Sequence, residues 1–361
     1  MIERAAEMVE AARLKAVFEG AGALPVEAAI LQPAEVLLDL YGEHIRARAY
    51  VTSDSLRGEQ MLRPDFTVPV VQMHMHHGAE PARYTYSGAV FRRQDDDAER
   101  ENEYVQVGYE VFDRANPAAA DAEVFALISG MVAPLGLRAA TGDIGILMAA
   151  VDALDTTERR RVALRRHIWH PRRFRALIER FSGRAPVPAS RVALLAADDP
   201  FADAAPMIGL RGRAEIEARI AALHQDAAAA PISAREVDMI DAILGVRAAM
   251  PYALGQLNDI AVDLPSIKGA VDRLAARMDA LAARGVDVSR LDFECSYGRT
   301  QMEYYDGFVF GFYADTRPDL PPVASGGRYD ALTRMLGQGA EIPAVGGVIR
   351  PGLMLELGAG A

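Results

Sequence analysis

Apolar and polar residues alternate most regularly between Tyr104 and Phe112, and this pattern predicts a β-strand with two distinct faces. One face suits a buried core and carries Val105, Val107, Tyr109 and Val111. The opposite face carries Tyr104, Gln106, Gly108, Glu110 and Phe112. The run from Tyr84 to Arg92 is rich in aromatic and small residues, so the segment is interpreted as two strands joined by a long charged loop.

Helical periodicity marks other parts of the chain. The first twenty residues predict a helix whose apolar positions are Met8, Ala11, Leu14 and Phe18. Asn116 is a suitable N-cap and Pro117 a suitable first residue for a helix that runs to Val132. Residues 137–148 predict a strand that continues into a helix, and residues 156 to about 284 predict a helical insertion interrupted by prolines.

Strands return at Leu291, and the alternation after Tyr305 places Phe308, Phe310 and Phe312 on one face. The predicted organisation is therefore a first core part over 1–155, a helical insertion over 156–289 and a second core part over 290–361.

Gln106 and Glu110 place an amide and a carboxylate on the same face of their strand, with Gly108 between them. The glycine leaves room for a small ligand to approach the backbone. A carboxylate beside an amide acceptor suits an ammonium group. The alternative is a surface hairpin whose polar face is in contact with water.

The hairpin resembles motif 2 of class II aminoacyl-tRNA synthetases, through FRRQ, a loop and YVQVGYEVF, and its Q-x-G-x-E part resembles the histidyl-tRNA synthetases. Met61 to Thr67, MLRPDFT, resembles the LRPEGT signature of that family, with Phe66 in the place of the glycine, where it could crowd the pocket. Arg299 to Tyr313 resembles the histidine-specific signature, Ala324 to Leu332 its GGGRYD segment, and Pro343 to Gly346 the start of motif 3.

These segments occur in the family's order along most of the chain. A looser match to motif 1 lies in Ile30–Pro33 and the following AEVLLDLYGE. The resemblance implies an α+β fold with a mixed, mostly antiparallel sheet flanked by helices. It also implies a histidine-binding pocket lined by Asp65, Thr67, Arg92, Gln106, Glu110, Tyr304 and Tyr305.

The cations that activate an amino acid with ATP do not match the family. Thr300 stands where the histidine signature has an arginine, and Leu353 stands at the arginine of motif 3. In motif 2, Gln94 stands in place of a glutamate. The loop that follows carries six acidic residues whose carboxylates would repel polyphosphate: Asp95, Asp96, Asp97, Glu99, Glu101 and Glu103. We also expect the anticodon-binding domain, of ~100 residues in such synthetases, to be missing.

Composition limits the choice of partners. The net charge of −11 argues against tRNA binding, because a nucleic acid backbone is bound by surface lysines and arginines. The sequence has 51% hydrophobic and 25% charged residues, no apolar run of membrane-spanning length and no signal peptide pattern, so we expect a soluble cytoplasmic protein without membrane contact. The single cysteine, Cys295, is interpreted as a core thiol. His74 and His77 are interpreted as part of a helix face, and no metal site or cofactor is expected.

A synthetase core that keeps an amino acid pocket and loses activation resembles the regulatory subunits of the short-form ATP phosphoribosyltransferase. The resemblance implies a non-catalytic subunit, a homodimer within a hetero-oligomer, that pairs with the catalytic subunit and serves feedback control of histidine biosynthesis by histidine. One alternative is a tRNA-independent ligase of the same fold that activates a small acid with ATP. Another is a dimeric scaffold without a ligand. The basic segment Arg159–Arg180 is either a docking surface or a solvated helix.

Overall fold

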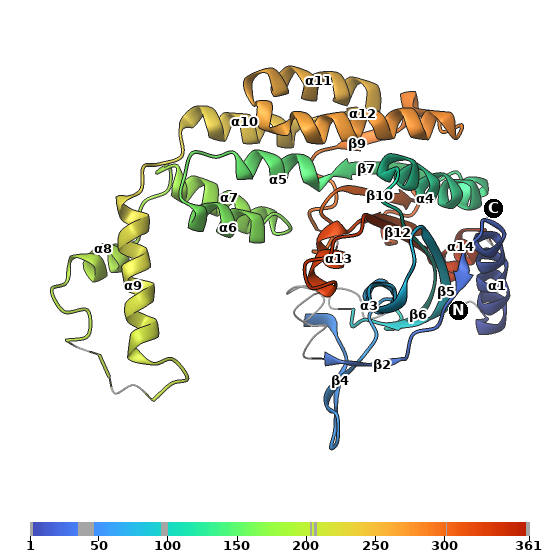
Figure 1. Cartoon of the computed structure of the whole chain (residues 1–361), viewed down its shortest axis with the longest axis horizontal. Helices are drawn as coiled ribbons and strands as arrows, with labels where there is room; N and C mark the ends of the chain where they lie inside the picture. Colours follow the sequence, from blue (N-terminus) through green and yellow to red (C-terminus); the bar gives the residue numbers. More distant parts are fainter. Residues whose placement is uncertain are drawn as a thin grey trace.

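A curved, mostly antiparallel sheet forms the centre of the molecule, as the computed structural model shows (Figure 1). The structure describes residues 3–34, 47–94, 100–202, 204–205, 208–300 and 302–358. Within these ranges nine strands pair in the order β1-β5-β6-β12-β11-β10-β7-β9-β8. Their bounds are β1 Leu24–Pro25, β5 Ala82–Phe91, β6 Glu103–Phe112, β7 Arg138–Asp143, β8 Arg247–Ala249, β9 Asp292–Glu294, β10 Phe308–Tyr313, β11 Ala324–Arg328 and β12 Ala344–Ile349. The pairs β1–β5 and β7–β9 are parallel and the rest antiparallel, which confirms the predicted fold class.

A smaller sheet of β2 (Leu31–Pro33), β4 (Gly58–Leu62) and β3 (Val51–Asp54) lies beside the main one. The sequence match to motif 1 continues from β2 into AEVLLDLYGE, most of which lies outside the described residues. The helices are α1 Arg4–Gly20, α3 Thr67–His77, α4 Pro117–Val132, α5 Ile144–Asp152, α6 Glu158–Arg166, α7 Pro171–Phe181, α8 Ala189–Ala196, α9 Arg213–Ala228, α10 Ala234–Gly245, α11 Met250–Asp263, α12 Lys268–Ala283, α13 Asp330–Leu336 and α14 Pro351–Gly358.

The hairpin β5–β6 confirms the two strands predicted around the charged loop. Its register pairs Tyr84 with Glu110, Tyr86 with Gly108, and Gly88 with Gln106, so these six residues share one face of the sheet. Both faces of β6 are buried from its third residue onward. One face packs on helices, and the other forms the candidate site.

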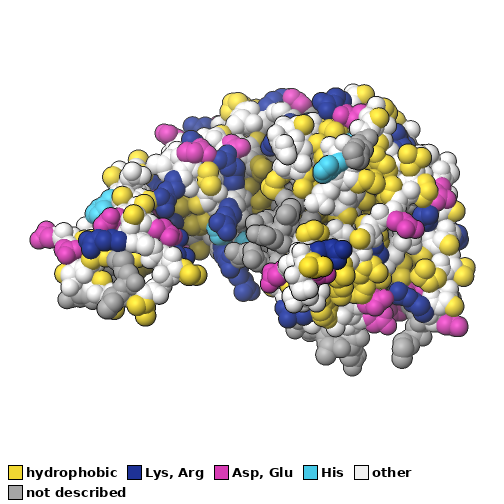
Figure 2. Space-filling view, turned by 60° about the horizontal axis from the view of Figure 1, so that its bottom comes forward, with side chains coloured by type: hydrophobic (Ala, Val, Ile, Leu, Met, Phe, Trp, Pro, Cys, Tyr) yellow, Lys and Arg dark blue, Asp and Glu magenta, His cyan; other side chains and the backbone are white. Residues whose placement is uncertain are grey.

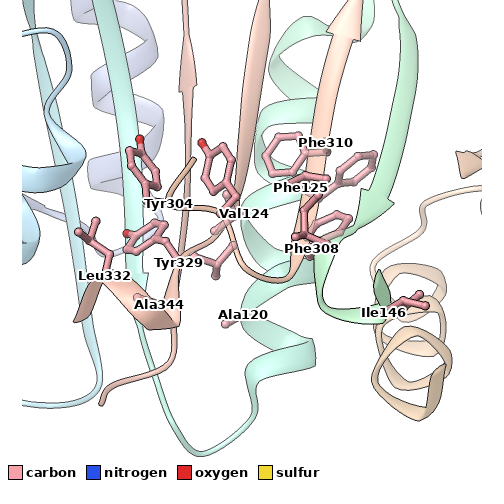
Figure 3. Close-up of a cluster of buried hydrophobic side chains, with 14 of the residues drawn as sticks. Ala120, Val124, Phe125, Ile146, Tyr304, Phe308, Phe310, Tyr329, Leu332 and Ala344 are labelled. Carbon is pink, nitrogen blue, oxygen red and sulfur yellow. The ribbon is translucent and has the colours of Figure 1, made fainter. Parts of the chain in front are cut away.

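The helix-covered face of the sheet is an aromatic core (Figure 3). Phe125 of α4 contacts the rings of Phe308, Phe310 and Phe312, which confirms the alternation predicted for this strand. At the other end of the sheet Phe18 of α1 stacks on Tyr109, with ring centroids 4.9 Å apart. These ring contacts fix the helices against the strands from which the site residues project.

The predicted first helix is confirmed and begins at Arg4, and three of its apolar positions, Ala11, Leu14 and Phe18, are buried. The fourth, Met8, is 47% exposed. Glu7 takes the inward position instead and accepts a hydrogen bond from the backbone N–H of Val105 at 3.4 Å. The buried face of this helix therefore includes a polar contact with β6 beside its apolar residues.

Helix α4 and the turn that follows it, Pro117–Leu135, are long and apolar enough to cross a membrane. Among the described helices no other has both the length and the hydropathy. It packs between the sheet and α12, and Asn116 caps it by accepting from the N–H of Ala119. Its buried Asp121 accepts hydrogen bonds from Arg277 of α12 and Arg328 of β11. These features are those of a core helix.

The predicted insertion contains two unlike parts. Strand β8 pairs with β9 of the main sheet, and α12 packs on α4. Helices α8 and α9 instead form an arm that extends away from the core (Figure 1), with no buried residue in α8 and only Ala222 buried in α9. Figure 2 shows several Lys and Arg side chains beside the hollow between this arm, on the left, and the rest of the molecule.

Several arginines of the Arg159–Arg180 segment form ion pairs within the fold. Its ion pairs include Arg160–Asp226 at 2.7 Å, Arg161–Glu158 at 2.9 Å, Arg165–Asp152 at 2.5 Å and Arg175–Glu179 at 3.4 Å. These pairs leave fewer arginines available to a partner and so favour the interpretation of the segment as solvated helix, here the two helices α6 and α7. Docking through it stays a prediction.

Candidate functional site

The seven predicted pocket residues come from four separate segments and meet on the face of the sheet opposite the aromatic core. Asp65 lies just before α3 and Thr67 is the first residue of that helix. Arg92 directly follows β5, β6 provides Gln106 and Glu110, and the loop before β10 provides Tyr304 and Tyr305. Three contacts connect these segments. Thr67 Oγ1 donates to Glu110 Oε1 at 2.9 Å, Tyr304 Oη donates to Asp65 Oδ2 at 3.2 Å, and Arg92 Nη2 lies 3.9 Å from Asp65 Oδ2.

Glu110 is the central acceptor of the site and is 1% exposed. Besides Thr67, the hydroxyl of Tyr86 donates to Oε1 at 2.7 Å and the hydroxyl of Tyr329 donates to Oε2 at 2.5 Å. Burial raises the pKa of Glu110 to about 7, although the three hydroxyl donors act in the opposite direction. At neutral pH this carboxyl group is therefore poised between its two protonation states.

Tyr86 and Tyr329 are site residues that the sequence reasoning missed. The sequence could have indicated Tyr86, because pairing the two strands of the hairpin places it opposite Gly108, on the same face as Gln106 and Glu110. Tyr329 belongs to the ASGGRYDAL segment, which was matched to the GGGRYD segment of the family without a role for its tyrosine. Burial and the neighbouring carboxylate of Glu110 hold the pKa of both hydroxyls well above the ordinary value, so both remain hydrogen-bond donors.

Glycines form the floor of the site, and side chains of the protein lie directly over them. A Cβ at Gly108 would collide with the ring of Tyr86, and one at Gly346 would collide with the carboxylate of Glu110. A Cβ at Gly327 would lie 2.8 Å from the ring of Tyr305. The prediction that Gly108 leaves room for a ligand was wrong for this conformation, because Tyr86 fills that room.

Phe66 completes the cover over this floor. Its ring stacks on Tyr86 with centroids 4.4 Å apart and an interplanar angle of 11°, and the guanidinium of Arg63 lies 4.0 Å from its centroid. Phe66 is 1% exposed. The predicted crowding by this residue is confirmed, since any ligand at Gly108 must first displace the Tyr86–Phe66 stack.

Gln106 is also 1% exposed, and its Oε1 has no hydrogen-bond partner within the described part of the chain. A buried amide oxygen without a donor costs free energy that a ligand carrying an N–H group can recover. Gln106 therefore marks the position in the site where an added donor would be most favourable.

Arg299, next to Thr300, does not take the place of the arginine that the synthetases have in the histidine signature. Arg299 turns away from the site, donates from Nε to the carbonyl of Ile168 at 2.8 Å and lies 4.8 Å from the ring centroid of Phe174. Burial lowers the pKa of Arg299 to about 10. Thr300 is exposed. Of the acidic loop, Asp95 to Asp97 and Glu99 lie outside the described residues, while Glu101 and Glu103 are exposed.

His74 is a core residue. Its ring stacks on Phe112 with centroids 3.9 Å apart, and its Nδ1 lies 3.1 Å from the hydroxyl of Tyr84. Cys295 is 1% exposed, and burial raises the pKa of its thiol, as fits the predicted core thiol. Across the described ranges no three His, Cys, Asp or Glu side chains are arranged to hold a metal ion.

The fold and the position of these segments on one sheet face define the class II aminoacyl-tRNA synthetase core. The structure resembles that of an ATP phosphoribosyltransferase regulatory subunit/histidyl-tRNA synthetase from Bacillus halodurans, with a TM-score of 0.66 at 20% identity over 99% of this chain and 81% of that one. It also resembles a histidyl-tRNA synthetase from a Nostoc species, with a TM-score of 0.65 at 18% identity over 99% of this chain and 73% of that one.

The sequence is similar to the same group of proteins. The family model of histidyl-tRNA synthetase matches residues 2–198 and 213–351. Proteins from Brucella ovis and Brucella abortus, both named ATP phosphoribosyltransferase regulatory subunit, are 31% identical over 340 residues, which is 89% of this chain and 89% of each relative. The chain belongs to the ATP phosphoribosyltransferase regulatory subunits, a family built on the histidyl-tRNA synthetase core.

Proposed function

We propose that this chain is the regulatory subunit of a short-form ATP phosphoribosyltransferase and acts in histidine biosynthesis. The observation that carries the proposal is the 31% identity to named regulatory subunits over 89% of both chains. The relatives' name implies a catalytic subunit as partner. The finer parts of the proposal are that the chain forms a homodimer within the complex, binds histidine and does not bind tRNA.

Histidine is the proposed ligand of the site around Glu110. The unpartnered oxygen of Gln106 and the carboxyl of Glu110 would accept hydrogen bonds from the ammonium group or a ring N–H of histidine. Tyr304 and Tyr305 would line the part of the site that holds the imidazole ring. Their rings lie 5.0 Å apart and meet edge to face. Entry requires the Tyr86–Phe66 stack to open, so the empty and occupied sites differ in conformation. A ligand that binds one of two arrangements more tightly shifts the protein toward it, which is what a feedback sensor needs.

The proposed role includes no amino acid activation. Thr300 is exposed and uncharged, Arg299 donates to the carbonyl of Ile168, and Leu353 occupies the motif 3 position. Pyrophosphate exchange with histidine and ATP checks this directly, and we expect no histidine-dependent rate. A clear rate would instead favour the ligase interpretation.

The complex itself is tested by mixing the purified chain with a short-form catalytic subunit. We expect a larger species by light scattering, a higher rate of phosphoribosyl transfer than the catalytic subunit shows alone, and a lower rate when histidine is added. Separate elution together with an unchanged rate contradicts the regulatory role.

Calorimetry with Glu110→Ala tests the histidine site. Loss of one partner of a buried charged pair should weaken binding by roughly 2–5 kcal/mol. Glu123→Ala is the matched control, because Glu123 is also a buried carboxylate that accepts from a tyrosine hydroxyl, that of Tyr109 at 2.5 Å, on the other face of β6. Equal histidine affinity in the wild type and both variants rejects the assignment of this site.

A further inference from the structure

Asp306 joins two segments of the chain that supply tyrosines to the candidate site. It directly follows Tyr305 in the loop before β10, and its carboxylate reaches the start of α13. Its Oδ1 accepts from the backbone N–H of Asp330 at 3.0 Å, and its Oδ2 accepts from that of Ala331 at 2.6 Å. The backbone N–H of Asp306 donates to the carbonyl of Arg328 at 3.0 Å. Hydrogen bonds of one residue therefore hold the two segments together.

The tyrosines on the two sides of this junction contact one another. Tyr329 belongs to the segment that Asp306 binds, and its ring centroid lies 6.1 Å from that of Tyr304 at an interplanar angle of 85°. The hydroxyl of Tyr329 donates to Glu110 at 2.5 Å. The contacts of Asp306 therefore influence the donors around Glu110, although Asp306 itself lies outside the ring of donors.

The same contacts cap helix α13. The N-cap residue of this helix is Tyr329, whose side chain forms no capping hydrogen bond within the described part of the chain. The first N–H groups of a helix need acceptors, because they have no partner within the helix. Here the acceptor comes from the loop that carries Tyr305 and not from the residue at the helix start. Any change that weakens this cap therefore also loosens the tyrosines.

The charged groups around Asp306 come from five elements: Asp330 of α13, Arg328 of β11, Asp121 of α4, Asp143 of β7, and Arg273 and Arg277 of α12. Burial and the carboxylate of Asp330 raise the pKa of Asp306 to about 7, while the two N–H donors and Arg328 act in the opposite direction. Burial also raises the pKa of Asp330. Near neutral pH the Asp306 side chain therefore exchanges a proton within the folded protein.

The ionised and protonated forms of Asp306 differ as acceptors. Both oxygens of a carboxylate accept strongly from N–H groups, whereas one oxygen of the protonated form carries a hydrogen and accepts weakly. The hydrogen bonds to Asp330 and Ala331 use both oxygens of Asp306. A proton on Asp306 therefore weakens one of these two bonds.

We propose that Asp306 is a positioning residue of the ligand site, which clamps Tyr305 against Tyr329 when it is ionised and loosens them when it takes up a proton. The contacts of Asp306 with residues 328–331 form this clamp. The proposal deepens the histidine site, and its effect on ligand affinity rests on that proposed function. The site then responds to the proton concentration as well as to the ligand, and the ordered arrangement of the tyrosines is favoured as the pH rises.

Calorimetric titration of the full chain with histidine, at pH 6 and at pH 8, compares the wild type with Asp306→Asn. Asparagine retains one acceptor oxygen and cannot ionise. The variant should bind histidine about tenfold more weakly than the wild type at pH 8, and less than about threefold more weakly at pH 6, where the wild type carries the proton. Titration of Glu110 and of histidine itself affects both proteins alike, so the ratio of the two affinities isolates Asp306.

Asp54→Asn is the matched control. Asp54 also accepts from two successive backbone N–H groups, those of Leu56 at 2.8 Å and Arg57 at 2.9 Å, at the turn between β3 and β4. These hydrogen bonds lower the pKa of Asp54, so it is ionised at both pH values. Its variant should match the histidine affinity of the wild type at pH 6 and at pH 8.

The fluorescence of Trp169, the single tryptophan of the chain, follows the clamp without a ligand, because its Nε1 donates to the carbonyl of Tyr305 at 3.2 Å. Between pH 5 and pH 9 the folded wild type should show a transition near pH 7 that persists in Glu110→Gln and disappears in Asp306→Asn. Asp330→Asn removes the neighbouring negative charge and should move the transition to lower pH. An unchanged midpoint in Asp330→Asn overturns the clamp even where Asp306→Asn does not fold.

The clamp and the proposed histidine site can fail separately. A fluorescence transition that remains in Asp306→Asn belongs to another group and overturns the clamp. A loss of affinity of equal size at pH 6 and pH 8, or no loss at either, also overturns it and leaves the histidine site standing. Absence of histidine binding to the wild type, together with a transition that depends on Asp306, rejects the histidine site and retains the clamp.

Discussion

Replacing Glu110 by glutamine should change how the stability of the protein depends on pH. Burial raises the pKa of Glu110 from 4.5 to about 7, so the folded protein retains a proton that the unfolded chain has lost between these values. Stability therefore falls as pH rises through this window, and the full cost is reached above the folded pKa. The shift of about 2.5 units corresponds to a cost of about 3 kcal/mol, at 1.36 kcal/mol per unit.

Glutamine cannot ionise, and its oxygen can still accept from Thr67 and Tyr86. From pH 5 to pH 8 the free energy of unfolding of Glu110→Gln should consequently rise by about 2.5 kcal/mol relative to the wild type, because part of the cost is already present at pH 5. Urea unfolding measures this difference, with the fluorescence of Trp169, whose Nε1 donates to the carbonyl of Tyr305 at 3.2 Å, as the signal.

Glu123→Gln is the control for this prediction. Hydrogen bonds from Arg83 and Tyr109 outweigh burial and lower the pKa of Glu123, so this carboxylate is ionised in both states across the same window. Its difference from the wild type should stay constant from pH 5 to pH 8. A constant difference for Glu110→Gln as well would refute the argument that Glu110 titrates near neutrality.

Three further changes test the supports of the site. Arg277→Ala leaves the carboxylates of Asp121 and Asp143 without their shared partner and should cost about 3–5 kcal/mol in urea unfolding, whereas a loss below 1 kcal/mol contradicts the buried network. Phe125→Ala should cost about 3–5 kcal/mol by the same measurement, because the ring contacts three phenylalanines of β10, and an unchanged midpoint contradicts this packing. Asn116→Ala should cost about 1 kcal/mol through loss of the cap of α4, and Asn116→Asp, which can still accept, should restore most of it.

The sequence predicted the hairpin and the convergence of the site residues well, because both depend on short-range patterns. Alternation assigns Gln106 and Glu110 to one face, and the family segments place Asp65 and Tyr304 with them. The helix-facing aromatic core followed from the same period of two. The tertiary contacts that fill the site did not follow.

Which side chain fills the space above Gly108 depends on how β5 pairs with β6, and the pattern of one strand alone does not predict that pairing. Only the pairing of β5 with β6 brings Tyr86 across from Gly108, and only β12 brings Gly346 beside Glu110. Arg350, three residues before the motif 3 position at Leu353, directly follows β12, and its neighbour Ile349 pairs with Val107. The face to which a residue at the end of a strand projects depends on the neighbouring strand as well as on sequence spacing.

The buried contacts of Arg277 also determine which parts of the molecule can move independently. This arginine of α12 joins Asp121 and Asp143, and Asp121 in turn holds Arg328, the neighbour of Tyr329, whose hydroxyl contacts Glu110. Separating α12 from the sheet would break these ion pairs at a cost of several kcal/mol, so α12 is tied to the strand that leads into the site. The α8–α9 arm is tied elsewhere, because Asp226 of α9 pairs with Arg160 of α6 at 2.7 Å. A displacement of α12 is therefore expected to disturb the contacts of Glu110 more directly than a displacement of the arm.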